Sequence, residues 1–354
     1  MRHVVWGCAI LLTGCPENDF TRVTDTAGIP HDTGDTGVEP DDGIPDDVPV
    51  GGVQGRICAP NENVYVAGAK AAIEHEYGLS QTFTDADGYF TLTNVPAGDR
   101  MLVVEKGSFH VQIPVYIPQN EIVELAEEEC LEQEDLNIAV VTGQYDSIGS
   151  IISHLGLEYD AFNGLGSEGK NFLRDPERMA EYDIIFLNCG LNEEILRPSL
   201  GEIGDNIRDY ANEGGSVYAS DWAYFVIEEA FPSMVDFRGD DSDVYAARVG
   251  YPGTYEVSVL DPMMITALGG ETTANLRYDL GSWVTPVGSG GGGSPMVYGT
   301  YEYINSNGSV TNGEGPLAVE LPTAGGNVVY TTFHNEAQMT LDMEVLLQEI
   351  IWAL

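Results

Sequence analysis

The chain has 354 residues, with 14 Lys and Arg against 57 Asp and Glu, and its formal net charge at pH 7 is -43. This length predicts two folded domains plus a tail. So acidic a surface repels phosphate, which excludes nucleic-acid binding and direct electrostatic binding to anionic lipid headgroups. No apolar stretch reaches the roughly 20 residues that a membrane-spanning helix needs.

Residues 1–14 are predicted to be a signal peptide, in which Arg2 precedes a short apolar run over Val4–Leu12. The run ends in Leu12-Thr13-Gly14-Cys15, which resembles the lipobox of bacterial lipoproteins. The resemblance implies that Cys15 is lipidated and that the protein lies in the cell envelope, anchored to a bacterial membrane, with the outer membrane favoured. An ordinary secretory signal with a chance cysteine is the alternative.

Residues 15–50 are predicted to be a tether. They are rich in Asp, Thr, Gly and Pro and have few large apolar residues, so they bury too little surface to offset their ordering entropy. We expect a flexible acidic segment that reaches roughly 30–35 Å. A calcium-binding Asp-rich repeat is the alternative, although no acidic ligand follows it at a fixed spacing.

Residues 51–131 predict a small all-β domain, because short strand-like runs alternate with turn residues and no segment has helical periodicity over three turns. Phe90 and Leu92 point to one face of a half-buried strand. Asp87-Gly88 predicts a hairpin between this strand and the run at Thr82–Thr84. The pattern fits an Ig-like β-sandwich.

The order of four motifs in this domain resembles a carboxypeptidase regulatory-like domain. The motifs are Gly55-Arg56-Ile57, Val66–Lys70, Thr84–Phe90 and Val95–Gly98. The resemblance implies a seven-stranded, transthyretin-like sandwich that serves as a non-catalytic folding or interaction unit. The sequence here lacks a zinc-ligand cluster. For Asp85 and Asp87, a calcium site is the alternative to a hydrogen-bonded turn.

The chain has five cysteines. If Cys8 leaves with the signal peptide and Cys15 is lipidated, three remain in an oxidising compartment. Cys58 lies in the first expected strand of the β-domain and Cys130 just after the last. We therefore predict a Cys58–Cys130 disulfide, with two free buried thiols as the alternative, and Cys189 is left over.

Residues 135–354 predict an α/β domain, because continuous apolar strands alternate with amphipathic helices. The expected strands are Leu136–Thr142, Tyr182–Leu187, Ser216–Ser220 and Val328–Phe333. The expected helices follow Asp146 as N-cap, cover Leu200–Tyr210 and Tyr224–Phe231, and close the chain over Met343–Leu354. We expect an open, mostly parallel, flavodoxin-like sheet, with residues 233–327 as a β-rich insertion or as extra strands.

Two of these strands deliver polar residues at their carboxyl ends, where sites of open α/β sheets form. One ends in Phe333-His334-Asn335-Glu336 and the other in Ser220-Asp221. This resembles the class I glutamine amidotransferase-like fold and its trehalose-utilisation-type relatives, whose last strand carries Phe-His-x-Glu. The resemblance implies that His334 and Glu336 are the catalytic base and its orienting acid. It also implies that Asn188-Cys189-Gly190 forms the oxyanion loop.

Asp221 stands where that family has a cysteine nucleophile, while Ala219 and Ala223 keep the small flanks of a tight elbow. A carboxylate cannot form the usual thioester, so we expect no glutamine hydrolysis. Three interpretations stay open: a degenerate site that binds a ligand or nothing, a hydrolase with Asp221 as ester-forming nucleophile, and one that uses Cys189. We also expect Asp221 and His334 to lie within hydrogen-bond reach.

The sequence therefore favours a lipid-anchored envelope protein with a pseudoenzyme site that binds or scaffolds an unidentified envelope ligand or protein. We expect no nucleic acid, cofactor or metal ion. The competing class is an envelope hydrolase that combines Asp221 or Cys189 with His334 and Glu336.

Overall fold

The computed structural model describes residues 43–133, 136–232, 234–241, 243–279, 281–288, 292–335 and 339–354. The predicted signal peptide, Cys15, most of the predicted tether and Glu336 lie outside these residues. Within the part that is described, no helix is long and apolar enough to cross a bilayer.

The first described region, residues 50–130, is built from strands and is called the β-region below. Its strands are β1 (Val50–Cys58), β2 (Lys70–His75), β3 (Gly78–Phe83), β4 (Tyr89–Pro96), β5 (Gly98–Lys106), β6 (Phe109–Ile117), β7 (Ile122–Glu124) and β8 (Glu129–Cys130). They form two four-stranded sheets, one in the order β3-β2-β5-β6 and one in the order β4-β1-β7, with β8 also paired to β1. Phe90 and Leu92 are both buried in the apolar core, as their alternation along β4 predicts.

The hairpin predicted at Asp87-Gly88 is wrong. β3 pairs with β2 in one sheet, whereas β4 pairs with β1 in the other. The Asp85 carboxylate accepts the backbone N–H groups of Asp87 and Tyr89, at 3.0 and 2.9 Å, in an Asx-type turn. The residues thus form a turn, but it carries the chain from one sheet to the other because both strands find partners elsewhere in the sequence.

A disulfide joins Cys58, at the end of β1, to Cys130 in β8, and the two Cα atoms lie 4.2 Å apart. The two residues face each other in a parallel pairing of these strands. The bond spans a sequence separation of 72 residues. It therefore ties the first strand of the β-region to the last.

The second region, residues 136–354, is a nine-stranded sheet with helices and is called the α/β region below. Its parallel strands are β9 (Ile138–Thr142), β10 (Asp160–Asn163), β11 (Ile184–Leu187), β12 (Ser216–Ser220) and β19 (Val328–Thr331). Its helices are α1 (Ile148–His154), α2 (Ser167–Leu173), α3 (Pro176–Met179), α4 (Glu193–Leu196), α5 (Leu200–Asn212), α6 (Tyr224–Ala230), α7 (Pro262–Ala267) and α8 (Leu341–Ala353), with short 3-10 helices η1 (Arg197–Ser199) and η2 (Asp221–Ala223). The sheet order is β10-β9-β11-β12-β19-β18-β17-β14-β15.

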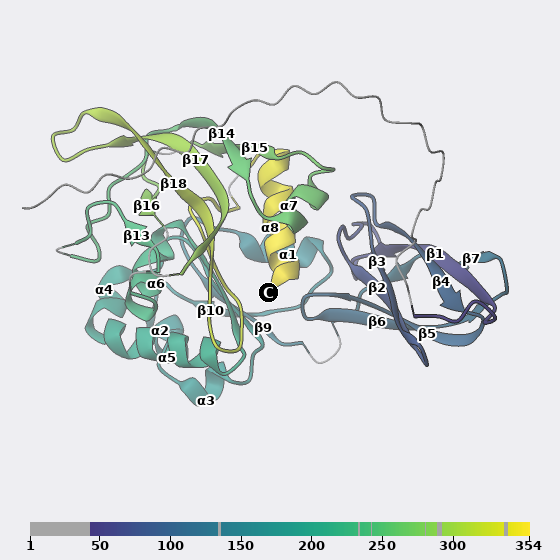
Figure 1. Ribbon diagram of the computed structural model, residues 1–354. Coiled ribbons are helices and arrows are strands. Elements are labelled where there is room, and N and C mark those ends of the chain that lie inside the picture. Colours follow the sequence, from purple (N-terminus) through teal and green to yellow (C-terminus); the bar gives the residue numbers. More distant parts are fainter. Residues whose placement is uncertain are drawn as a thin grey trace, which may run out of the picture. The chain divides into compact units, whose positions relative to one another are not determined.

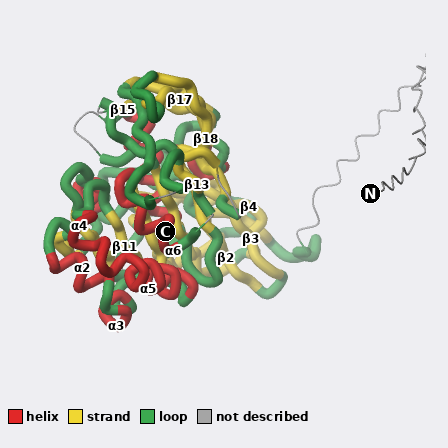
Figure 2. Tube along the Cα trace, turned by 90° about the vertical axis from the view of Figure 1, so that its left-hand side faces the viewer, coloured by secondary structure: helices red, strands yellow, loops and turns green. Residues whose placement is uncertain are grey.

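Side chains alternate along the parallel strands and divide the core between the two faces of the sheet. Val140 and Phe186 pack in one cluster with α1 and α8, whereas Val141 and Leu187 pack in another with α2, α5 and α6. Figure 1 shows α1 and α8 (yellow) together on one side, and Figure 2 shows α2, α3 and α5 close together on the other. The sheet is thus covered on both faces, which explains its continuously apolar strands.

The insertion at 233–327 is β-rich, as predicted, but most of its strands extend the main sheet. These are β14 (Gly253–Val259), β15 (Thr273–Tyr278), β17 (Ser294–Ile304) and β18 (Val310–Leu321), while β13 (Asp236–Phe237) and β16 (Pro286–Gly288) pair separately. The four strands join antiparallel, beginning with β18 against β19. The prediction of a mostly parallel sheet therefore holds for the five strands β10-β9-β11-β12-β19, whereas the sheet as a whole is mixed. The connections from β17 to β18 and from β18 to β19 are short, which favours antiparallel neighbours.

The β-region contacts the last helix of the α/β region. The Lys106 ammonium and the Glu349 carboxylate form an ion pair whose side chains are 5 % and 4 % exposed. Phe109 packs edge-to-face on Trp352 with ring centroids 4.8 Å apart. The Ser108 hydroxyl donates to the backbone oxygen of Leu354, at 3.1 Å.

Candidate functional site at the carboxyl edge of the sheet

Asp221 lies at a sharp elbow between β12 and α6. Its φ is +41°, in the left-handed region that a non-glycine residue rarely occupies, and its side chain is buried. The flanking Ala219 and Ala223 are both fully buried. This strained strand-to-helix turn is the geometry that the sequence predicted for the nucleophile position.

Both carboxylate oxygens of Asp221 have close neighbours. Oδ1 accepts the backbone N–H of Val284, at 2.6 Å, and this residue belongs to the insertion. Oδ2 lies 3.4 Å from Cys189 Sγ, which donates to it, and 3.8 Å from His334 Nδ1. The carboxylate is therefore fixed on one side by the backbone and faces a thiol and an imidazole on the other.

His334 follows β19 and is 4 % exposed. Its Nδ1 is at ion-pair distance from Asp221, slightly beyond the hydrogen-bond reach that we expected. Asn335, the next residue, donates its side-chain N–H to the Ser147 carbonyl, at 2.8 Å. Since Glu336 lies outside the described residues, its predicted role as the orienting acid stays a prediction.

The predicted oxyanion loop, Asn188-Cys189-Gly190, follows β11 at the same edge. Its Cys189 N–H already donates to the Ser220 hydroxyl, at 2.9 Å. The Asn188 side-chain N–H donates to the Asp146 carbonyl, at 3.2 Å. An oxyanion needs donors aimed at the reacting centre, and these two donors are engaged with the protein.

Cys189 itself is 1 % exposed and carries the only free thiol among the described residues. Burial raises the pKa of the Cys189 thiol, and the neighbouring Asp221 charge raises this pKa further. A reactive cysteine needs the opposite environment, in which positive charge lowers the pKa. These surroundings therefore favour the neutral thiol over the thiolate.

Asp146 belongs to the site, although the sequence predicts it only as a helix N-cap. Its Oδ2 accepts the Ser220 hydroxyl, at 2.5 Å, and its Oδ1 accepts the Ile148 N–H, at 2.8 Å. Burial raises the pKa of Asp146, while His334 nearby lowers it. Its position in the loop between β9 and α1 was the available signal, since β9 ends at the same edge of the sheet.

A cavity of about 460 Å³ opens onto these residues. Cys189, Asp221 and His334 line it together with aromatic rings of Tyr145, Trp222, Tyr278 and Trp283 and carboxylates of Glu193 and Glu194. The Trp283 ring stacks on Tyr278 with centroids 4.0 Å apart. The cavity thus combines apolar walls with negative charge, and it holds no positively charged side chain among its described lining residues.

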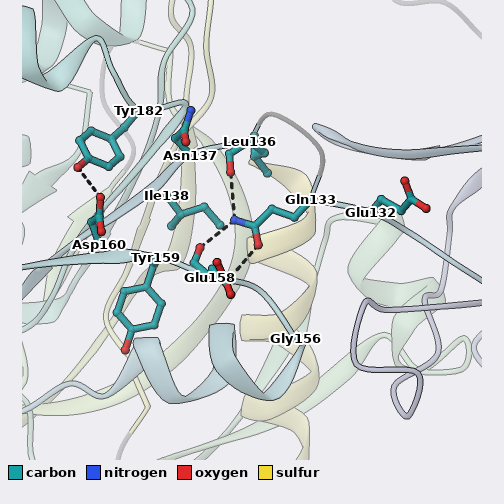
Figure 3. A pocket seen from close by; sticks show the side chains of 10 residues that line it. All are labelled: Glu132, Gln133, Leu136, Asn137, Ile138, Gly156, Glu158, Tyr159, Asp160 and Tyr182. Carbon is teal, nitrogen blue, oxygen red and sulfur yellow. Dashed lines mark hydrogen bonds between the residues drawn. The ribbon is translucent and has the colours of Figure 1, made fainter.

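A second cavity, of about 890 Å³, lies at the opposite edge, where the parallel strands begin. Figure 3 shows Gln133 at its centre, where the side chain bonds the carbonyls of Leu136 and Glu158, at 3.0 and 2.8 Å. Tyr182 donates to Asp160 at 2.8 Å on another wall. These polar groups form hydrogen bonds with one another, so this cavity is the weaker candidate for a ligand-binding site.

Comparison with known proteins gives only distant similarities. No family model matches the sequence, and no curated protein matches it significantly. Among solved structures, a ThuA-like protein from Bacteroides uniformis is 12% identical with a TM-score of 0.42, over 62% of this chain and 91% of that one. A ThuA-like protein from Parabacteroides merdae is 16% identical with a TM-score of 0.38, over 62% and 89% of the two chains.

A third structure, 5-hydroxyisourate hydrolase from Klebsiella pneumoniae, is 15% identical with a TM-score of 0.18, over 22% of this chain and 92% of that one. The structural neighbours thus include ThuA-like proteins, which have the glutamine amidotransferase-like fold, at low identity. At these identities and TM-scores, the similarities assign no activity, ligand or partner to this chain.

Proposed function

We propose that this chain is a ligand-binding protein of the cell envelope and that its elbow cavity binds without covalent catalysis. The proposal rests on the hydrogen bonds that the Asp221 carboxylate accepts. One of its oxygens accepts the Val284 N–H and the other accepts the Cys189 thiol. Donors on both oxygens stabilise the carboxylate and disfavour its attack on a substrate carbonyl.

Cys189 is not a substitute nucleophile. Its thiol is buried, its pKa is raised by burial and by Asp221, and its backbone N–H is engaged with Ser220. Thiol chemistry requires a thiolate, which this surrounding disfavours.

The cavity lining supports a ligand with an apolar face and positive charge. Aromatic faces attract cations, and carboxylates at Glu193 and Glu194 add negative charge at the wall. Burial raises the pKa of Glu193, while Arg197 lowers it. An anionic ligand would meet only like charge here.

Catalysis and binding are tested on the same purified protein. L-glutamine and p-nitrophenyl acetate should release no ammonia or nitrophenolate above background, and intact mass should show no acyl adduct. Tetramethylammonium should change tryptophan fluorescence saturably. Its binding should be about tenfold weaker in Glu193→Gln/Glu194→Gln. The control variant Glu229→Gln, at an exposed position on α6, should bind it like the unchanged protein. An adduct on Asp221, or turnover lost in His334→Ala, would overturn the proposal.

We also propose that Cys15 carries the lipid anchor and that the β-region is a carboxypeptidase regulatory-like sandwich that scaffolds the site. The Leu12–Cys15 quartet and the order of the four motifs support these two assignments. Mass spectrometry of the native protein should find an acylated Cys15 at the mature N-terminus. Cys15→Ala should appear in the soluble fraction, and unchanged membrane retention would rule the anchor out.

A further inference from the structure

Three metal-ligating side chains converge at the base of the elbow cavity. The ligand atoms of Cys189, Asp221 and His334 all lie within 4.8 Å of one another, and all three residues are buried. They come from the ends of β11, β12 and β19, which are neighbours in the sheet. Side chains far apart in the sequence therefore meet because three adjacent parallel strands end at one edge.

Two of the three distances between their ligand atoms are close to those around a tetrahedral metal ion. With bonds of about 2.3 Å to sulfur, 2.0–2.1 Å to nitrogen and 2.0–2.2 Å to oxygen, tetrahedral zinc holds its ligand atoms about 3.4–3.6 Å apart. The structure has 3.4 Å between Cys189 Sγ and Asp221 Oδ2, and 3.8 Å between that oxygen and His334 Nδ1. These two separations are within a few tenths of an ångström of the tetrahedral values, and the third, from the Cys189 sulfur to the His334 imidazole, is no longer than 4.8 Å.

The ligands are also held in place by the surrounding protein. Asp221 Oδ1 is occupied by the Val284 N–H, which leaves Oδ2 as a single ligand oxygen. The Cys189 backbone is fixed by Ser220, whose hydroxyl is in turn fixed by Asp146. Such outer contacts orient the ligands of protein metal sites.

We propose that Cys189, Asp221 and His334 bind one Zn²⁺-class transition-metal ion, whose fourth position faces the elbow cavity. This inference goes beyond the proposed function but rests on it, because it adds a metal ion at the base of the cavity that receives the cationic ligand. Sulfur and imidazole ligands select such metals over Mg²⁺ and Ca²⁺. The ion replaces the thiol proton, which leaves to solvent, and thiolate plus carboxylate then balance its two positive charges.

The test uses the full-length protein after removal of metals with a chelator. Titration with Zn²⁺ should load one equivalent by elemental analysis. Co²⁺ should give intense visible bands of tetrahedral coordination and a near-ultraviolet thiolate-to-cobalt charge-transfer band. Cys189→Ser and His334→Gln should each weaken binding more than about 100-fold, and Cys189→Ser should remove the charge-transfer band.

Two matched variants control for the other thiols and imidazoles. Cys58→Ala/Cys130→Ala removes the other cysteines that the structure describes, and His154→Ala changes an exposed histidine; the proposal uses none of these residues. Both should bind Co²⁺ like the unchanged protein, and circular dichroism should verify that every variant is folded. A folded Cys189→Ser that keeps the charge-transfer band, or metal binding equal in all variants, would overturn the site.

The outcomes separate this inference from the proposed function. If metal does not bind but tetramethylammonium does and no turnover occurs, only the metal inference fails. If metal binds as described and the chelated protein forms an acyl adduct on Asp221, only the proposed function fails.

Discussion

The β-region and the α/β region differ in what they bury. Among the described residues of the β-region, the fully buried polar or charged side chains are Thr84 and Lys106. The α/β region buries many more, namely Asp146, Asn188, Ser216, Ser220, Asp221, Asp240, Thr285, Thr331, Thr332, His334 and Glu349. Buried polar groups lower stability unless they are paired. Asp146, Asn188, Ser220, Asp221 and His334 gather at the carboxyl edge of the parallel strands, which marks that edge as the candidate functional site.

The largest expected effect comes from breaking the ion pair between Lys106 and Glu349, which joins the two regions. Lys106→Met leaves Glu349 buried without its partner and should lower the free energy of unfolding by about 3–5 kcal/mol in urea. The double variant Lys106→Met/Glu349→Leu should recover most of this loss, because an apolar pair can replace a buried ion pair.

The matched control is Lys70→Met, within the β-region. Its ion pair with Glu105 is exposed, with side chains at 33% and 46%, and such pairs contribute about 0–1 kcal/mol. Equal destabilisation by the two lysine substitutions would contradict the distinction between buried and exposed pairs.

The next prediction concerns the disulfide of the β-region. Replacing both Cys58 and Cys130 by alanine should cost about 4 kcal/mol, because the chain-entropy model assigns this to a loop closed over 72 residues. The measurement is urea unfolding with and without a reductant. Reduction should bring the unchanged protein down to the stability of the double variant, and insensitivity to reductant would argue against the bond.

A third prediction compares two buried hydroxyls with the same connectivity. Thr84 accepts the Ala69 N–H, at 2.8 Å, and donates to the Val66 carbonyl, at 2.6 Å. Ser220 accepts the Cys189 N–H and donates to the Asp146 carboxylate. Hydrogen bonds to charged groups contribute about 1.5–3 kcal/mol against about 1 kcal/mol for neutral ones.

Ser220→Ala should therefore destabilise by about 2–3 kcal/mol and Thr84→Val by about 1–2 kcal/mol, both measured by thermal unfolding. Only Ser220→Ala should also weaken Co²⁺ binding, because Ser220 positions Cys189. Equal unfolding costs would mean that Asp146 is protonated and accepts an ordinary neutral hydrogen bond.

Elements with strong local periodicity were predictable from the sequence. The strand Ser216–Ser220 has the bounds that were predicted, and α5 buries Leu200, Ile203, Ile207 and Tyr210 as expected. β10 and α2 were missed, because they bury few side chains: β10 buries Phe162, and α2 buries Gly169, Phe172 and Leu173. β11 and α1 are equally short but were predicted, because most of their residues are apolar and buried.

Pairing between distant segments was not predictable in the same way. The turn after Asp85 is encoded locally, but the sheet to which each flanking strand belongs is decided by strands elsewhere. For the site, the strand-end rule located Asp221 and His334, yet the closeness of Cys189 Sγ to both follows from the order β11-β12-β19. That order is a property of the whole sheet.

The smallest effect is a pH dependence that belongs to the α/β region. Burial, followed by the charge of Asp240, raises the pKa of Glu228 on α6 from its ordinary value of 4.5 to about 7. Burial also raises the pKa of Asp240 to about 6, and Asp236 and Asp241 add to the negative charge there. Folding therefore favours the protonated carboxyl groups.

The sign follows from proton binding. Between about pH 4.5 and pH 7 the folded protein binds more protons at Glu228 than the unfolded chain does, so stability falls as pH rises through this window. Because Glu228 is partly exposed, solvent screening limits the change to the order of 1 kcal/mol. Urea unfolding at pH 5 and pH 7.5, about the ends of the window, should show a smaller difference in Glu228→Gln and an unchanged one in Glu229→Gln. A dependence that survives in Glu228→Gln would assign the protons to another group, with Asp240→Asn the next variant to measure.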